Sequence, residues 1–295
     1  TDELEVVVRR SPLLIDFRDA RTHQLLNADE RPMSYVASGR LAGMQFDPKA
    51  GMFVAAAKKF GFDEHFYGLG EKAARLDKRR MSFVNWNSDT PGYNENKDPI
   101  YQTIPFYLGL QRGIAYGIFF DNSYRSYFDF GRASSERAWF GAEGGEMNYY
   151  FFYGPSIKKI LARYADLTGR LPLPPLWALG NQQSRWSYYP DSLVEQVVAE
   201  YRRRDLPLHA IHLDIDYMDG YRCFTWNKKY FPNPKKIITD LAAKGFKTIV
   251  IIDPGIKVDE NYWVFKEGRD NKFFCRRCDD YFMEGQVWPG RCQFP

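Results

Sequence analysis

The chain has few cysteines and histidines, with four of each among 295 residues. Cys275 and Cys278 have the C-x-x-C spacing of metal and redox sites, but a zinc site needs two more ligands, which only Cys223 and Cys292 could supply. We expect structural thiols, with a disulfide or a zinc site as alternatives. Thiols persist in reducing compartments, so the composition favours the cytoplasm, while a secreted or lysosome-like location stays open.

Long hydrophobic runs and an excess of charge of one sign are also missing. No apolar stretch approaches the ~20 residues that cross a bilayer, which argues against a membrane-spanning helix. The 41 basic and 37 acidic residues give a net charge of +4. The short basic clusters at 78–80 and 202–204 are typical of solvated faces, and no basic stripe indicates nucleic acid. No signal peptide is visible, although the chain begins at Thr1 and processing could have removed one.

Aromatic residues, in contrast, are abundant: 20 Tyr, 23 Phe and 7 Trp, or 17% of the chain. With hydrophobic residues at 44%, this is enough for a sizeable core and argues against disorder. Up to about residue 153, short β-branched and aromatic runs alternate with turn residues, as at 4–8, 114–120, 124–130 and 147–153. The pattern predicts an antiparallel β-sandwich.

A domain boundary is predicted shortly after this region. Residues 157–168 have helical spacing, with Gly169 as a stop, and the Leu-Pro-Leu-Pro-Pro stretch at 171–175 is a stiff linker. We assign residues 1–168 to an N-terminal β-sandwich domain and 169–295 to a second domain. In the first, the polar stretch 85–98 predicts a long loop, and such loops are often functional.

Beyond the linker, strands and helices alternate. We expect strands at 177–185, 209–217 and 247–253, with a helix capped by Asp191 and another opened by Asn233 before Pro234. This alternation predicts parallel strands at the start of an α/β (β/α)8 TIM barrel. About three strands would be present, so we expect an incomplete barrel, a tail after the third strand, and a chain that is the N-terminal fragment of a longer polypeptide.

The chemistry is expected to centre on residues 209–227. Along a strand, Ile211 and Leu213 share one face, whereas Asp214 and Asp216 lie on the other. An apolar face backed by a face of carboxylates suits a barrel strand. One side would pack on helices, and the other would place carboxylates at the mouth of the barrel.

The motif Asp-Ile-Asp-Tyr-Met-Asp at 214–219, followed by Phe-Thr-Trp at 224–226, resembles the second barrel strand of glycoside hydrolase family 31, the α-glucosidases. Val-Trp-Pro-Gly at 287–290 and Phe-Tyr-Gly-Leu-Gly-Glu at 66–71 are similar to other family motifs. The resemblance runs from about residue 66 to the last residue. It implies a retaining, exo-acting α-glucosidase that removes terminal non-reducing α-linked glucose from oligosaccharides.

The resemblance also implies a pocket for the terminal sugar, formed by Asp89, Trp186, Asp214, Ile215, Ile251 and Trp288. The aspartate that matches Asp214 accepts hydrogen bonds from sugar hydroxyls, which suits an ionised carboxylate. The two tryptophans match aromatic walls, and the two isoleucines match smaller apolar walls. Asp89 matches an aspartate that a sandwich loop supplies over the barrel mouth.

From the residues alone, plainer interpretations stand beside these. Asp214 could pair with an Arg or His, isolated tryptophans are more often core residues, and Asp89 could simply turn the chain. We expect Asp216 and Asp219 to order their loop. Asp253 is left open between pocket support and capping of a strand end.

No catalytic residue is assigned in this chain. In the family, the nucleophile lies in a Trp-x-Asp-Met-Asn-Glu segment on the fourth strand and the acid/base lies later, and neither motif occurs in these 295 residues. The expected partner is an α-glucoside oligosaccharide. We expect no cofactor, metal, nucleic acid or membrane, and a homo-oligomer stays open.

Other functions remain as alternatives: an α-xylosidase or transglucosylase of the same family, or a non-catalytic carbohydrate-binding protein if 295 residues are the whole product. In α-xylosidases of the family, the positions matching 215–217 tend to be Cys-Phe-Trp, and the sandwich-loop aspartate is missing. The Ile-Asp-Tyr at 215–217 and Asp89 therefore favour glucose over xylose.

Overall fold

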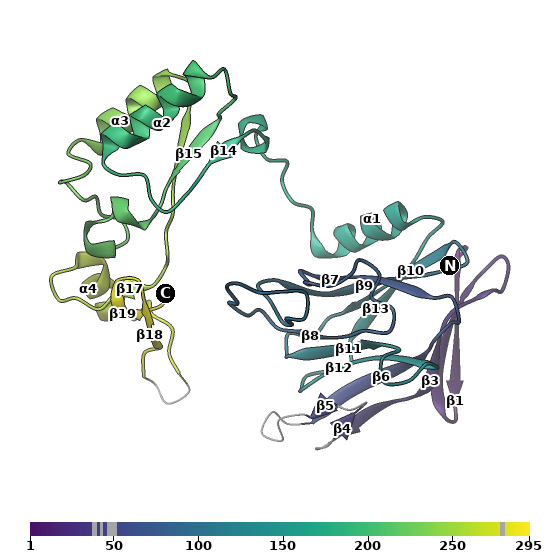
Figure 1. The fold of residues 1–295 in the computed structure, drawn as a ribbon. Coiled ribbons are helices and arrows are strands. Elements are labelled where there is room, and N and C mark those ends of the chain that lie inside the picture. The colour runs from purple at the N-terminus through teal and green to yellow at the C-terminus, as the bar shows by residue number, and fades with distance from the viewer. Residues whose placement is uncertain (37–39, 42–43, 46–51, 278–280) are drawn as a thin grey trace. The chain divides into compact units, whose positions relative to one another are not determined.

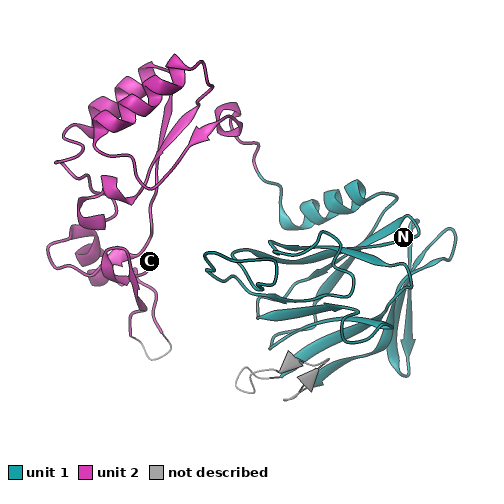
Figure 2. Ribbon diagram, in the orientation of Figure 1, with its two compact units in different colours: residues 1–171 teal, residues 172–295 magenta. Residues whose placement is uncertain are grey.

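The structure, a computed structural model, describes residues 1–36, 40–41, 44–45, 52–277 and 281–295. The chain divides into two compact units, Thr1–Leu171 and Pro172–Pro295 (Figure 2). Within the described part of the chain, no helix has both the length and the apolar character needed to span a membrane.

Unit 1 contains two large antiparallel sheets (Figure 1). The seven-stranded sheet has the order β1-β2-β3-β6-β12-β11-β8, formed by Leu4–Arg10, Leu13–Asp19, Leu25–Val36, Phe53–Lys59, Arg137–Ala142, Ser126–Phe130 and Ser82–Asn85. The four-stranded sheet has the order β13-β10-β9-β7, formed by Tyr149–Tyr153, Ile114–Phe120, Thr103–Gln111 and His65–Gly70. A short hairpin of β4 (Arg40–Leu41) and β5 (Met44–Gln45) completes the strands described in this unit.

The side chains of β6 show how the strand period builds two packed faces. Val54 and Ala56 belong to a buried cluster that also takes residues from the four-stranded sheet, such as Ile118. Phe53 and Ala55 point to the opposite face and join a second cluster. Because neighbouring residues of a strand face opposite ways, an apolar run with both faces covered is buried throughout.

The helix α1 (Ile157–Thr168) covers the four-stranded sheet, against β10 and β13. Its predicted bounds are confirmed: the Ser156 side chain accepts from the backbone N–H of Lys159, and Gly169 ends the helix with φ of 95°. Ile160 is fully buried beside Gly117, where an added Cβ would lie 2.9 Å from its Cγ2. The helix therefore packs closely on the sheet at a position that needs a glycine.

Unit 2 is built on three parallel strands in the order β14-β15-β16, formed by Gln182–Gln183, Ala210–Leu213 and Lys247–Val250. The helix α2 (Asp191–Arg203) connects the first pair and α3 (Pro234–Ala243) the second. The start of α3 is confirmed, since Asn233 caps it by accepting from the N–H of Lys236.

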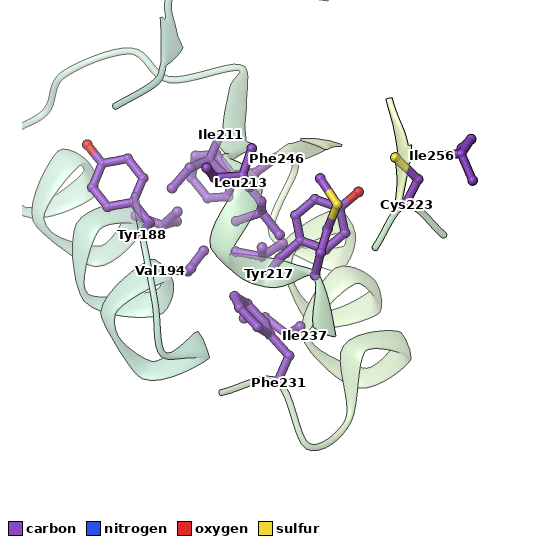
Figure 3. Packing of buried hydrophobic residues seen from close by; sticks show 14 of the residues in the cluster. Tyr188, Val194, Ile211, Leu213, Tyr217, Cys223, Phe231, Ile237, Phe246 and Ile256 are labelled. Atoms are coloured by element: carbon purple, nitrogen blue, oxygen red, sulfur yellow. The ribbon is translucent and has the colours of Figure 1, made fainter. Parts of the chain in front are cut away.

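One hydrophobic cluster holds the strands and helices of unit 2 together (Figure 3). Ile211 and Leu213 from β15 pack in it with Val194 from α2 and Ile237 from α3. All four side chains are at most 5% exposed. The predicted apolar face of the segment 209–217 is therefore its core face, as expected for a strand lying against helices.

The three predicted strands of unit 2 are shorter than expected. The segment predicted as the first strand, 177–185, begins within a 3-10 helix, η1 (Leu176–Leu179). Only Gln182–Gln183 form a strand, which pairs with β15. The second strand ends at Leu213 because the Asp214 side chain accepts from the N–H of Ile215 and starts a 3-10 helix, η2 (Ile215–Tyr217). Apolar and polar residues continue to alternate through η2, which is why the sequence predicted a strand as far as residue 217.

The remaining predictions for unit 2 also need correction. The helix α2 begins at Asp191, with Pro190 rather than Asp191 at the capping position. The tail after β16 contains the unpredicted helix α4 (Trp263–Asp270). A small antiparallel sheet in the order β17-β19-β18 follows β16 and is formed by Ile256–Lys257, Gly290–Gln293 and Glu284–Val287.

Candidate functional site

Asp214 lies at the carboxyl end of β15, the middle strand of the parallel sheet. Its Oδ1 accepts a hydrogen bond from the backbone N–H of Ile215 at 2.8 Å, and the residue is half-buried. No Lys, Arg or His of the described residues forms an ion pair with this carboxylate. Most of its acceptor capacity is therefore available to a ligand.

Trp186 lies between β14 and α2 and is 71% exposed. Its indole Nε1 donates to Oδ2 of Asp216 at 2.8 Å, and the hydroxyl of Tyr221, in the 3-10 helix η3 (Asp219–Tyr221), donates to the other carboxylate oxygen at 3.3 Å. The charge of Asp216 raises the pKa of Tyr221, which keeps the phenol protonated as a donor. Asp216, which lies two residues after Asp214 in the chain, thus holds the exposed ring of Trp186 in place.

The segment after β16 is tied to the loop after β15. The hydroxyl of Tyr217 donates to the carbonyl of Ile251 at 2.9 Å, and Sγ of Cys223 donates to the carbonyl of Asp253 at 3.0 Å. Burial raises the pKa of Tyr217 to about 12 and also raises the pKa of Cys223, so both groups stay protonated and donate at neutral pH. The side chain of Ile251 is left exposed at the end of the sheet.

Trp288 lies in the turn between β18 and β19 and is 70% exposed. Its hairpin approaches the segment that follows Asp253, because a Cβ added at Gly255 would lie 2.7 Å from Cγ2 of Val287. Side-chain contacts link the segments that follow β14, β15 and β16 to one another, and the β18–β19 hairpin contacts the last of them. These segments carry Trp186, Asp214, Ile251 and Trp288, which we call the exposed group.

Ile215 and Asp89 differ from these residues. Ile215 is only 7% exposed and belongs to the core cluster of unit 2. Asp89 is exposed in the loop between β8 and β9 of unit 1. The predicted contacts of both residues with a sugar stay predictions.

The loop after η2 is braced by polar contacts. The backbone N–H of Asp219 donates to Oγ1 of Thr225 at 2.9 Å. Nε of Arg222 donates to Oδ2 of Asp259 at 3.1 Å, and this hydrogen bond lowers the pKa of the Asp259 carboxyl. These contacts order the chain next to Asp214, and neither Tyr221 nor Asp259 carried a sequence signal of this role.

The thiols and acidic groups show no metal centre in the part of the chain that is described. No three His, Cys, Asp or Glu side chains gather there as possible ligands. Cys223 and Cys292 are buried free thiols, and Cys275 is exposed and free. Cys278 lies outside the described residues, so the expectation for the Cys275–Cys278 pair stays a prediction.

The exposed group has the chemistry of a binding surface. A carboxylate without a cationic partner can accept from two neighbouring hydroxyls, and exposed indoles offer apolar faces to a ring. The arrangement suits a polyhydroxylated ring better than a charged or extended apolar ligand.

Comparisons with known proteins show which family the chain resembles. The family model for the N-terminal galactose mutarotase-like domain of glycosyl hydrolase 31 matches residues 1–129, and the glycosyl hydrolases family 31 TIM-barrel domain matches residues 171–295. Alpha-glucosidase 2 of Bacillus thermoamyloliquefaciens is 40% identical over 98% of this chain, and the alpha-glucosidase of Saccharolobus solfataricus is 37% identical over 82%. The chain spans 35% of the length of each of these relatives.

A solved structure shows the same likeness. The dextranase FjDex31A of Flavobacterium johnsoniae, complexed with glucose, superposes with a TM-score of 0.89 at 33% identity, over 100% of this chain and 34% of the dextranase chain. Both family models, both relatives and this structure point the same way: the chain belongs to glycoside hydrolase family 31.

Proposed function

We propose that the protein is a retaining, exo-acting α-glucosidase that hydrolyses terminal non-reducing α-linked glucose from oligosaccharides. The observation that carries the proposal is the Asp214 carboxylate, which stands at the end of β15 without an ion pair among the described residues. Its motif and the 40% identity to an α-glucosidase support glucose as the sugar.

In this proposal the chain supplies the binding wall for the terminal glucose rather than the reacting carboxylates. Asp214 accepts hydrogen bonds from sugar hydroxyls, and Trp186, Trp288 and Ile251 contribute exposed apolar surface. Ile215 contributes chiefly through its N–H, which orients the Asp214 carboxylate.

The role of Asp89 in unit 1 is to approach the same sugar from the sandwich loop. Its exposure leaves the side chain available for this contact. The family's nucleophile and acid/base motifs do not occur in this sequence, so no catalytic role is given to any residue of the chain.

The domain organisation belongs to the same proposal. Residues 1–168 form a β-sandwich, supported by two antiparallel sheets that share one core cluster, and residues 169–295 form the first part of a (β/α)8 barrel, supported by three parallel strands with helical connections. Free Cys223 and Cys292 support a cytoplasmic location.

The decisive measurement compares two matched substrates on the full-length gene product. We expect release of 4-nitrophenol and glucose from 4-nitrophenyl α-glucoside, with at most weak release of xylose from the corresponding α-xyloside. Release of xylose without glucose would establish the α-xylosidase alternative instead.

A second candidate is a glucanase that acts on dextran, and one observation favours it. A dextranase complexed with glucose aligns with the whole of this chain. Dextran chains digested with the full-length gene product separate the two candidates. An exo-acting α-glucosidase releases only glucose from the start of the reaction, whereas internal cleavage yields oligosaccharides first.

A further inference from the structure

Unit 1 contains a cavity of about 320 Å³ in which none of the six residues predicted for the sugar pocket takes part. It lies where β8, β9 and the β10–β11 connection meet. Its lining is formed by Asn85, Trp86, Asn87, Thr103, Pro105, Asn122, Ser123, Tyr124 and Ser126. This volume is near the lower end of the ~300–1,000 Å³ of small-molecule sites, so the cavity suits a small ligand.

The amide of Asn85 is the unusual group in this lining. Asn85 is only 4% exposed, and neither its Oδ1 nor its Nδ2 has a hydrogen-bond partner among the described residues. Buried amides are nearly always hydrogen-bonded, because desolvation without a partner costs free energy. One side chain of the lining thus carries both an acceptor and a donor without a partner among the described residues.

The two neighbouring asparagines are engaged within the fold. Oδ1 of Asn87 accepts from the backbone N–H and the hydroxyl of Thr103, both at 2.9 Å. Nδ2 of Asn122 donates to the carbonyl of Gly144 at 2.9 Å. The amides of Asn87 and Asn122 thus stabilise the walls of the cavity by hydrogen bonds, whereas the Asn85 amide makes none among the described residues.

Two aromatic side chains complete the lining. Trp86 is 48% exposed and Tyr124 is 51% exposed. The Tyr124 ring lies against Gly144, where an added Cβ would be 2.8 Å from Cε1, so one part of the ring is fixed on backbone while the rest stays open. Fixed, half-exposed aromatic rings are suitable stacking surfaces for sugars.

The lining carries no Asp, Glu, Lys, Arg or His, so its chemistry fits a neutral ligand. Amide and hydroxyl groups that both donate and accept are matched by the hydroxyls of a saccharide, and the ring faces match the two aromatics. We propose that this cavity is a second saccharide-binding site that takes a neutral glucosyl unit. The choice of glucose as the sugar rests on the proposed function, whereas the neutral polyhydroxyl class does not.

The test titrates the full-length gene product with maltose and measures binding by calorimetry. All variants are made in an Asp214→Asn background, which weakens binding at the predicted sugar pocket and leaves the second site unchanged. We expect this background to bind maltose in the millimolar range. Asn85→Leu, of similar size but without an amide, and Trp86→Ala should each weaken binding at least tenfold.

Controls separate this result from misfolding and from the proposed function. Asn85→Leu should leave the melting temperature equal or higher, because the amide it removes has no partner. Trp263→Ala, a tryptophan in α4 that is also exposed, should leave binding unchanged. Absence of maltose binding in the Asp214→Asn background, or binding that survives both Asn85→Leu and Trp86→Ala, would overturn the second site without bearing on hydrolysis.

Discussion

The indole N–H of Trp186 donates to the carboxylate of Asp216 across 2.8 Å and so joins the loop after β14 to the 3-10 helix after β15. The ring is otherwise largely exposed, and the same carboxylate also accepts from the Tyr221 hydroxyl. A ring held in this way is ordered before a ligand arrives. The side chain that orders it lies two residues from Asp214, so the aromatic surface and the acceptor are set by one short stretch of chain.

We expect Asp216→Ala to weaken binding of an α-glucoside by two- to tenfold. Without its acceptor, Trp186 must be immobilised when the sugar binds, and ordering a side chain costs about 0.5–1.5 kcal/mol. The measurement is KM for 4-nitrophenyl α-glucoside with the full-length gene product, under conditions in which KM reflects binding.

A double-mutant cycle gives the control for this prediction. Trp186→Phe keeps an aromatic ring but cannot donate to Asp216, so Asp216→Ala should add little in that background. An equal loss in both backgrounds would mean that Asp216 acts in another way than by holding Trp186.

Asp214→Asn should weaken glucoside binding about 10- to 150-fold. The substitution keeps the shape but loses the charge, and hydrogen bonds to charged groups contribute about 1.5–3 kcal/mol. Asp240→Asn on the outer surface of α3 is the matched control and should change KM less than twofold, because its ion pair with Lys236 is exposed. Unchanged KM in Asp214→Asn would remove the basis of the proposed sugar pocket.

The buried ion pair of unit 1 gives a prediction on stability. The side chains of Lys58 and Asp29 are both 1% exposed, and Nζ of Lys58 lies 2.6 Å from Oδ1 of Asp29. The backbone N–H of Ile15 donates to the other carboxylate oxygen of Asp29 at 2.8 Å. Lys58→Met leaves a buried carboxylate without its cation and should cost about 3–5 kcal/mol in the free energy of unfolding. Urea denaturation measures the loss.

The double variant Lys58→Met/Asp29→Asn should recover a large part of that stability. Its neutral amide still accepts from Ile15 but no longer needs a cation. A double variant as unstable as Lys58→Met alone would show that packing around Lys58, rather than the unpaired charge, dominates.

Asp19 gives a prediction for the acid range. The Tyr153 hydroxyl and the backbone N–H of Thr22 donate to its carboxylate and lower its pKa from 3.8 to about 2. A lowered pKa means that the ionised form is favoured in the folded state, so this stabilisation is present above about pH 4 and is lost as the pH falls towards 2. Melting temperatures of the wild type and Asp19→Asn should differ at neutral pH and converge near pH 2. A difference that stays constant down to pH 2 would contradict the assignment.

Local signals predicted the elements with strong end markers. Ser156 and Gly169 bound α1, and Asn233 with Pro234 starts α3, because capping and backbone conformation are properties of a few adjacent residues. The helix α4 escaped detection because no side chain caps its start and only Phe265 and Gly268 are buried along it.

The site was predictable in part. The motif at 214–219 singled out Asp214, but the positioning contact of Asp216 with Trp186 joins residues 30 positions apart and follows no sequence period. The unpartnered amide of Asn85 is equally invisible in the sequence, since it depends on what the surrounding strands leave unsatisfied. Contact between Asp89 and a sugar stays a prediction from the sequence.

The sequence alone determined the family, the change from sheet-forming to alternating strand and helix patterns, and the identity of the acidic residue at 214, because each of these is written in neighbouring residues. Tertiary structure decided that Asp214 ends its strand by capping η2, that Trp186 is held by Asp216, and that Ile215 is a core residue. Such outcomes depend on which distant groups meet and on which polar atoms remain without a partner, and only the folded packing fixes both.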